Sequence, residues 1–255
     1  MLRLKTIDKE EYDNYVRNHQ YKSHFLQSLS WGEFAKVKKN LTPHYLGLTT
    51  EDNQLVAATL LLEKHLPMNM CYLYAPRGFV IDFNKKELLK TMTKKVVEFA
   101  KTRKAIFVKI DPDIIRKSYD YQNEEQELTY DPEVIFDNIK KAGFKHLGFT
   151  KNFETSQPRY SFRINLEQSM EDIENHLSKT TKQRIAKSEK LETEVVIGTK
   201  KDIKEFYHLM TLTENRKDFV SHDLDYYKNL YRIYNEENSF NIFLGSINLN
   251  HIIKK

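Results

Sequence analysis

Glycine and cysteine are scarce in this 255-residue sequence, and each shortage excludes a class of function. The seven glycines are scattered and form neither a Walker sequence nor a dinucleotide-binding fingerprint. This argues against a typical acetyl-CoA enzyme, which wraps the pyrophosphate in a glycine-containing loop before a helix N-terminus. The single cysteine, Cys71, has no partner for an intramolecular disulfide, and the sequence holds no zinc-type Cys/His cluster. We therefore expect no metal and no cofactor, and we interpret Cys71 as a buried, unreactive thiol.

Long apolar runs are also lacking. No stretch approaches the roughly 20 apolar residues of a membrane-spanning helix, and the N-terminus has no signal-peptide core. With one cysteine, this pattern predicts a cytoplasmic protein that can still touch the inner face of a membrane peripherally.

Apolar and aromatic residues are plentiful, with 40% hydrophobic residues, 15 Tyr and 15 Phe, which predicts a packed globular chain. The net charge is +5, from 41 basic and 36 acidic residues. This charge suits polyanionic partners such as RNA or pyrophosphate lipids, and it equally suits an ordinary solvated surface.

Helical and strand periodicities alternate along the chain, which predicts an α/β (α+β) fold. Ser30 and Glu33 are spaced as a capping box, and Asn84 is placed to cap a later helix. The apolar run at 105–110 predicts a strand buried on both faces. The expected helices are 8–18, 31–39, 84–103, 131–141, 170–177, 179–190, 203–214 and 226–234, and the expected strands are 44–48, 55–63, 70–75, 105–110, 160–166, 194–197 and 239–244.

An aperiodic stretch at 152–159 marks a predicted junction between a first domain, 1–153, and a second, 154–255. The second half contains only three expected strands. They would leave a sheet edge open, which is a liability in a finished domain, so we expect this domain to be incomplete.

Three features suggest binding chemistry, and each has an ordinary structural alternative. Lys36 and Lys38 can hold a phosphate as point charges, or they can lie on the solvated face of a helix. Asp111 follows the apolar 105–110 run and precedes a proline, so its carboxylate either faces a crevice or starts a turn. The run 179–190 holds five basic residues against one acidic residue, so contact with an anion and a solvated helix face both remain open.

An ordered set of segments occurs between residue 25 and residue 244, and together these segments are more specific than any one alone. They are FLQSLSWGE (25–33), CYLYAPRGFVID (71–82), VKIDPD (108–113), AGFKHLGF (142–149), QPR (157–159), the basic run 179–190, LMTLTENRKDF (209–219) and DLDYY (223–227). In this order they resemble the Fem family of non-ribosomal peptidyl transferases. The resemblance is closest to the members that add the first bridge residue to the stem-peptide lysine.

This resemblance implies two tandem domains of the acetyltransferase-like (GNAT) fold, the second incomplete here because relatives continue well past residue 255. It implies an aminoacyltransferase with aminoacyl-tRNA as co-substrate and no acetyl-CoA. The acceptor is the stem-peptide lysine of lipid II or of a UDP-linked muropeptide. Association with another copy or with other Fem relatives is a further implied partnership.

The resemblance also suggests site residues. Lys36, or second Lys38, resembles a phosphate-binding lysine of the family. Asp111 matches an aspartate near the acceptor peptide, where a carboxylate would orient or deprotonate an ammonium group. Tyr226 matches a substrate-contacting tyrosine, and Arg216 matches a recurrent arginine without an assigned role.

His222 stands where relatives carry an acceptor-binding arginine, so the bidentate fork of a guanidinium is missing at this position. This departure and the missing C-terminal part leave a second reading. The chain is then a truncated, non-catalytic module that binds muropeptide or pairs with a partner.

Overall fold

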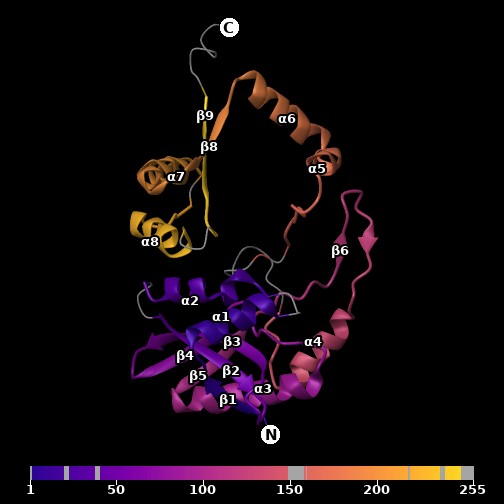
Figure 1. Cartoon of the computed structure of the whole chain (residues 1–255), viewed down its shortest axis with the longest axis vertical. Coiled ribbons are helices and arrows are strands. Elements are labelled where there is room, and N and C mark those ends of the chain that lie inside the picture. The colour runs from indigo at the N-terminus through magenta and orange to yellow at the C-terminus, as the bar shows by residue number, and fades with distance from the viewer. Residues whose placement is uncertain are drawn as a thin grey trace. The chain divides into compact units, whose positions relative to one another are not determined.

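Two units divide the chain, Met1–His146 and Leu147–Lys255, and each is described by itself (Figure 1). The computed structural model describes residues 2–19, 23–37, 41–148, 158, 160–217, 219–235 and 239–247. The predicted domain junction falls largely outside these residues, so the division at 153/154 stays a prediction. No helix among the described residues is long and apolar enough to cross a membrane.

A mixed five-stranded sheet forms the centre of the first unit. Its strands, in spatial order, are β1 (Arg3–Thr6), β2 (Leu41–Thr49), β3 (Leu55–Leu66), β4 (Met70–Ala75) and β5 (Ala105–Ile110). Neighbours are antiparallel up to β4, whereas β5 runs parallel to β4. The parallel step needs a crossover, and α3 (Lys86–Thr102) supplies it.

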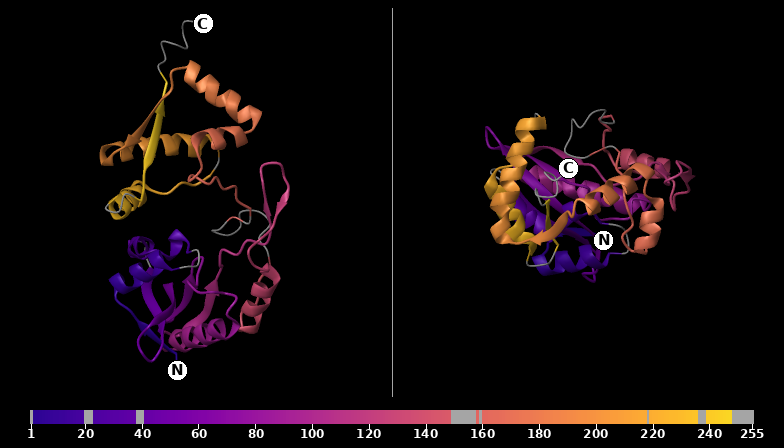
Figure 2. Two further views of the ribbon diagram at one scale, coloured as in Figure 1. Left: turned by 45° about the vertical axis from the view of Figure 1, so that its right-hand side comes forward. Right: turned by 90° about the horizontal axis from the view of Figure 1, so that it is seen from above.

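Helices cover both faces of this sheet, as Figure 2 shows. On one side, α1 (Lys9–Asn18) and α2 (Leu29–Ala35) pack on Leu60 and Leu62 of β3, and we call this the α1/α2 face. On the other, α3 and α4 (Pro132–Lys141) pack on Leu61 and Leu73, and we call this the α3/α4 face. Because β3 is buried on both sides, its sequence is a continuous apolar run without alternation.

Two predicted helix caps are wrong. Ser28, not Ser30, caps α2, because a short 3-10 turn at Phe25–Gln27 leads the chain into the helix earlier than the Ser/Glu spacing indicates. Its hydroxyl accepts from the backbone N–H of Trp31 at 3.1 Å. Asn84 caps nothing: α3 begins after Lys85 and has no side-chain cap.

The interpretation of β5 as a fully buried strand is also wrong. It is the last strand of the sheet among the described residues, with Ile106 54% and Phe107 49% exposed. Val108 and Ile110 pack into the α3/α4 face. The apolar run 105–110 therefore forms a strand that is partly buried and partly exposed to solvent.

Two short strands in the first unit lie where we expected no strand. β6 (Ser118–Tyr119) and β7 (Glu125–Gln126) form a small antiparallel hairpin that is hydrogen-bonded apart from the main sheet.

The second unit contains α5 (Met170–His176), α6 (Lys179–Lys190), β8 (Glu194–Gly198), α7 (Ile203–Lys217), α8 (Leu224–Asn235) and β9 (Ile242–Ser246). β8 and β9 pair antiparallel, and Ile203, Tyr227 and Ile242 form the small core. The predicted strand at 160–166 is wrong: no strand is described there, and Phe162 is fully exposed. Its apolar/polar alternation has period two, but it meets no partner strand in the described part of the chain.

Both units are therefore mixed α/β, as predicted. The assignment of both to the acetyltransferase-like fold stays a prediction.

Candidate functional site

Asp111 lies directly after β5, and both of its carboxylate oxygens accept hydrogen bonds. The Tyr74 hydroxyl donates to Oδ2 at 2.8 Å, and the backbone N–H of Arg77 donates to Oδ1 at 2.7 Å. These bonds fix the orientation of the carboxylate. Each oxygen retains a second lone pair, so the group can still accept from a substrate ammonium.

The second donor belongs to a tight turn after β4. Arg77 has φ +53°, in the left-handed region that non-glycine residues seldom adopt. Its Nη1 lies 3.8 Å from the Asp113 carboxylate, while its buried Nε has no hydrogen-bond partner among the described residues. A largely buried guanidinium thus lies beside the Asp113 carboxylate, while the backbone N–H of the same residue binds Asp111.

Gln27 holds this turn in place. Its side chain is fully buried and donates from Nε2 to the Pro76 carbonyl at 2.8 Å and to the Leu60 carbonyl at 3.3 Å. Its Oε1 accepts from the backbone N–H of Leu60 at 2.9 Å. One amide therefore ties β3 to the Pro76–Arg77 turn, and through that turn to Asp111.

Aromatic and basic side chains from three strands form a connected group around Tyr72 and Tyr74. We call Tyr72, Tyr74 and Phe107 the aromatic shelf. Tyr72 and Phe107 stack with ring centroids 4.9 Å apart at 15°. The Lys109 ammonium lies 5.2 Å from the Tyr74 ring centroid, and the Lys64 ammonium lies 5.9 Å from that of Tyr72. An ammonium group at these distances from an aromatic ring is attracted to the ring by a cation–π interaction.

Lys36 lies at the C-terminal end of α2, with 45% of its side chain exposed. Its ammonium is 3.0 Å from Glu33, which also pairs with Lys9 at 2.9 Å and accepts from the Tyr45 hydroxyl at 2.9 Å. Burial raises the pKa of Glu33, but the bonds from Lys9, Lys36 and Tyr45 outweigh it and lower that pKa overall. Because Lys9 and Tyr45 also hold Glu33, Lys36 can turn to a phosphate without leaving a carboxylate unpaired.

Lys36 and Asp111 belong to the same side of the sheet. Tyr74, which holds Asp111, is paired with Leu62, and Leu62 packs into the α1/α2 face, where Lys36 ends its helix. The structure thus places both predicted residues on one face of the first unit. Lys38 lies outside the described residues.

The three residues predicted in the second unit lie around the connection between α7 and α8. His222 and Tyr226 stack with ring centroids 3.7 Å apart at 14°, and the backbone N–H of Tyr226 donates to Asp223. Burial, with Tyr227 nearby, raises the pKa of Tyr226, so its hydroxyl stays protonated and can donate. Arg216 is exposed in the last turn of α7 and makes no ion pair with any described residue. The structure brings His222 and Tyr226 together and does not join Arg216 to them.

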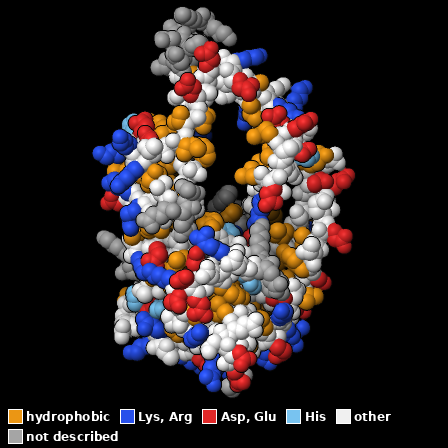
Figure 3. Space-filling model, viewed as in Figure 1, with side chains coloured by type: hydrophobic (Ala, Val, Ile, Leu, Met, Phe, Trp, Pro, Cys, Tyr) orange, Lys and Arg blue, Asp and Glu red, His pale blue; other side chains and the backbone are white. Residues whose placement is uncertain are grey.

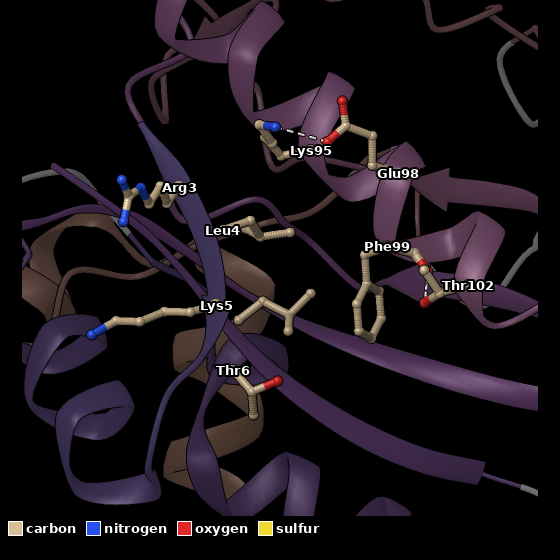
Figure 4. Close-up of a pocket in the computed structure, with 9 residues that line it drawn as sticks. Arg3, Leu4, Lys5, Thr6, Lys95, Glu98, Phe99 and Thr102 are labelled. Carbon is tan, nitrogen blue, oxygen red and sulfur yellow. Dashed lines mark hydrogen bonds and ion pairs between the residues drawn. The ribbon is translucent and has the colours of Figure 1, made fainter. Parts of the chain in front are cut away.

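A hollow of about 520 Å³ lies elsewhere, between β1 and α3 (Figure 4). Leu4 and Phe99 point into it, and the Lys95–Glu98 ion pair spans part of its rim. Leu4 packs on the α3/α4 face, so the hollow is on the opposite side of the sheet from Asp111. It contains none of the predicted residues.

A buried charge cluster on the α3/α4 face is structural. The Glu63 side chain, 3% exposed, lies 2.7 Å from His44 Nε2 and accepts from Arg103 at 2.9 and 3.3 Å. It joins β2, β3 and the end of α3. Cys71 lies beside it, buried, with its thiol donating to the Arg103 carbonyl and its pKa raised mainly by burial. The prediction that Cys71 is buried is confirmed, and its low reactivity stays a prediction.

The sequence reasoning missed Tyr74, Arg77, Gln27 and the aromatic shelf. A signal for the shelf was present: in β4, Tyr72 and Tyr74 alternate with buried Cys71, Leu73 and Ala75, so the tyrosines share one face. No comparable signal marks Gln27, whose contacts are all distant in sequence.

Comparison with known proteins adds an independent finding. The model of the FemAB family matches residues 7–255. A lipid II:glycine glycyltransferase of Staphylococcus aureus is 28% identical over 257 aligned residues, covering 98% of this chain and 56% of that protein. The corresponding protein of the bovine strain RF122 / ET3-1 shows the same identity and coverage. The crystal structure of FemX aligns with a TM-score of 0.82 and 25% identity, covering 99% of this chain and 60% of that one. The chain thus spans little more than half the length of these relatives.

Proposed function

Because the chain belongs to the FemAB family, we propose that it is a transferase of peptidoglycan bridge synthesis. It moves an aminoacyl group from aminoacyl-tRNA to the stem-peptide lysine of lipid II or of a UDP-linked muropeptide. The similarity to a glycyltransferase acting on lipid II supports glycine and lipid II as the first substrates to test. The observation that carries the proposal is the doubly hydrogen-bonded Asp111 carboxylate, on the same face as Lys36.

The reaction assigned to Asp111 is aminolysis of an ester. The lysine ammonium donates hydrogen bonds to the carboxylate and loses a proton to it or to water through it. The amine nitrogen then attacks the ester carbonyl, a C–N bond forms, and the C–O bond to the ribose breaks. The departing ribose oxygen takes up a proton. Asp111 suits this role because Tyr74 and Arg77 hold its oxygens in place before substrate binds.

Substrate-binding roles are proposed for residues of each unit separately. Lys36, with Lys38 second, holds a phosphate of the pyrophosphate linkage, and Arg216, His222 and Tyr226 contact the substrate in the second unit. No cofactor is required beyond the aminoacyl-tRNA co-substrate. The proposed location is the cytoplasm, with peripheral contact at the inner membrane face where lipid-linked acceptors lie.

The test is a transfer assay with radiolabelled glycyl-, alanyl- and seryl-tRNA, offered with lipid II and with UDP-linked muropeptide. We expect transfer from one donor, and we expect Asp111→Asn to lower kcat by about 100-fold or more. Asp52→Asn, which makes the same change in an exposed turn, serves as the matched control. Absence of transfer from all three donors, or full activity of Asp111→Asn, contradicts the proposal.

One observation favours the second candidate, a non-catalytic module that binds muropeptide or pairs with a partner. Val195, Ile197 and Phe243 are each about 65% exposed, and they lie on the face of β8–β9 opposite Ile242 and Leu244. The protein prepared for the transfer assay also tests this second function. A non-catalytic module would bind muropeptide, or form an oligomer detected by light scattering, and would transfer no aminoacyl group.

A further inference from the structure

The α6 helix has an unusual charge pattern. Five of its twelve residues are basic, and only Glu189 is acidic. All five basic side chains are exposed. Successive positions around the helix place Arg184, Lys187 and Lys190 along one continuous stripe. The basic residues of α6 are Lys179, Lys182, Arg184, Lys187 and Lys190.

Four other helices pair at least one basic residue with an acidic residue of the same helix. Ion pairs one turn apart occur in α1 (Arg17–Asp13), α3 (Lys95–Glu98), α4 (Lys140–Asp137) and α8 (Lys228–Asp225). In α6 no acidic residue of the helix stands three or four positions from any basic one. None of its five cations has an ion pair with a described residue. Figure 3 shows a mixture of both signs on the face of the first unit that is turned to the viewer.

The pattern is also unfavourable for the helix alone. Like charges three residues apart recur at 179/182, 184/187 and 187/190, and such pairs destabilise a helix. Two cations occupy the first turn, next to the positive end of the helix dipole, and no acidic residue accompanies them. An anion bound along α6 would relieve both effects.

The uncharged residues of α6 indicate which polyanion fits. Ile185 and Ala186 are its only apolar residues, so α6 lacks the Trp/Phe/Leu face with which helices enter a membrane interface. The remainder are Thr180, Thr181, Gln183 and Ser188, whose hydroxyl and amide groups are typical donors to phosphates and sugars of nucleic acids.

We propose that the basic face of α6 is a docking surface for the phosphate backbone of RNA. This rests on the proposed function in one respect: the RNA is the tRNA body of the donor. The contacts are to phosphates and sugars, so α6 contributes affinity and orientation without reading base sequence.

The test uses the full chain, fluorescein-labelled deacylated tRNA and anisotropy titrations at several salt concentrations. The variant Arg184→Gln/Lys187→Gln/Lys190→Gln removes three cations and two like-charge pairs, and glutamine supports a helix. We expect affinity to fall at least about tenfold and the slope of log K against log salt to decrease by about 2 to 3. Circular dichroism verifies that the helix is retained.

The matched control is Lys86→Gln/Lys90→Gln/Lys94→Gln, which makes the same charge change on exposed positions of α3. We expect it to alter tRNA affinity less than about twofold, because only net charge changes. Equal losses in both variants overturn the proposal, and so does a wild-type chain that binds no tRNA.

A second arm uses vesicles of phosphatidylglycerol and phosphatidylcholine. Loss of vesicle binding with tRNA binding unchanged assigns α6 to a membrane and overturns the RNA proposal. In the transfer assay, we expect the α6 variant to raise KM for aminoacyl-tRNA while kcat stays within about twofold. If transfer proceeds with unchanged KM, the α6 proposal fails and the proposed function stands. If the wild type transfers nothing while its tRNA binding depends on α6, the function fails and the docking surface stands.

Discussion

Replacing Gln27 by leucine tests whether one buried amide supports the candidate site. The leucine has a similar volume but cannot bond the groups that Gln27 now satisfies. Three buried backbone groups lose a bond to Gln27, and two of them are left without a side-chain partner: the N–H of Leu60 and the carbonyl of Pro76. The Thr59 hydroxyl keeps the Leu60 carbonyl as an alternative acceptor at 3.4 Å.

The expected cost follows from the two unsatisfied groups. Each costs about 1 to 3 kcal/mol when buried without a partner, and the apolar leucine recovers part of this, so we expect a loss of about 3 kcal/mol. A domain stable by about 5 to 15 kcal/mol still folds after such a loss, so kinetic measurements remain possible. They should show a lower kcat, because the Pro76–Arg77 turn no longer holds Asp111 firmly.

The chain offers a convenient assay. Trp31 is its single tryptophan and lies in α2 of the first unit, so urea unfolding followed by its fluorescence reports that unit alone. Gln54→Leu, in an exposed turn, makes the same chemical change without burial. A loss below about 1 kcal/mol for Gln27→Leu, or a loss equal to that of Gln54→Leu, would refute the reasoning.

Three further predictions concern other contacts of the first unit. Tyr74→Phe removes one of two bonds to Asp111, so we expect kcat to fall about three- to tenfold with KM unchanged, and an unchanged kcat argues against positioning. Lys36→Met should raise KM for the acceptor about tenfold or more with little change in stability, measured by initial rates and thermal melting. Burial lowers the pKa of His44 below its usual 6.5, so the unfolded chain binds more protons and stability declines as pH falls below that value. The pKa of Glu63 is also lowered, because its bonds from Arg103 and His44 outweigh its burial, so a second decline follows below pH 4.5. Urea midpoints should fall as pH decreases across this range. His44→Phe should remove the first decline and lessen the second, because Glu63 then keeps only its bonds from Arg103.

Local signals predicted some elements well, and their limits have physical causes. The bounds of β4 and α6 were predicted as observed, because a proline ends the first and a serine caps the second. The wrong Ser30 cap shows that several serines near a helix start satisfy the same spacing rule. The 160–166 segment shows that apolar/polar alternation is compatible with a strand but does not suffice, because a strand forms only where a partner strand supplies hydrogen bonds.

The candidate site was predictable only in part for a related reason. Asp111 was recognised because a carboxylate stands directly after an apolar strand and before a proline. The groups that orient it come from elsewhere: Tyr74 and Arg77 precede it by more than thirty residues, and Gln27 precedes it by more than eighty. Such contacts arise from the sheet order, and no periodicity along the chain encodes them.

Asp111 accepts one of its two hydrogen bonds from a backbone N–H, so substitutions in the turn at 76–78 should differ in their effect on its orientation. One of its two constraints is the N–H of Arg77, which no substitution at position 77 other than proline removes. The geometry of that N–H depends on the turn, and the turn is held by Gln27 through Pro76. Gly78 contributes as well, because a Cβ there would lie 2.8 Å from the Gln27 amide nitrogen. Gly78→Ala should therefore displace Gln27 and lower kcat, while Arg77→Ala should retain the bond to Asp111 and lose only the guanidinium. An Arg77→Ala variant with less activity than Gly78→Ala would show that the guanidinium, and not the turn, is what the site requires.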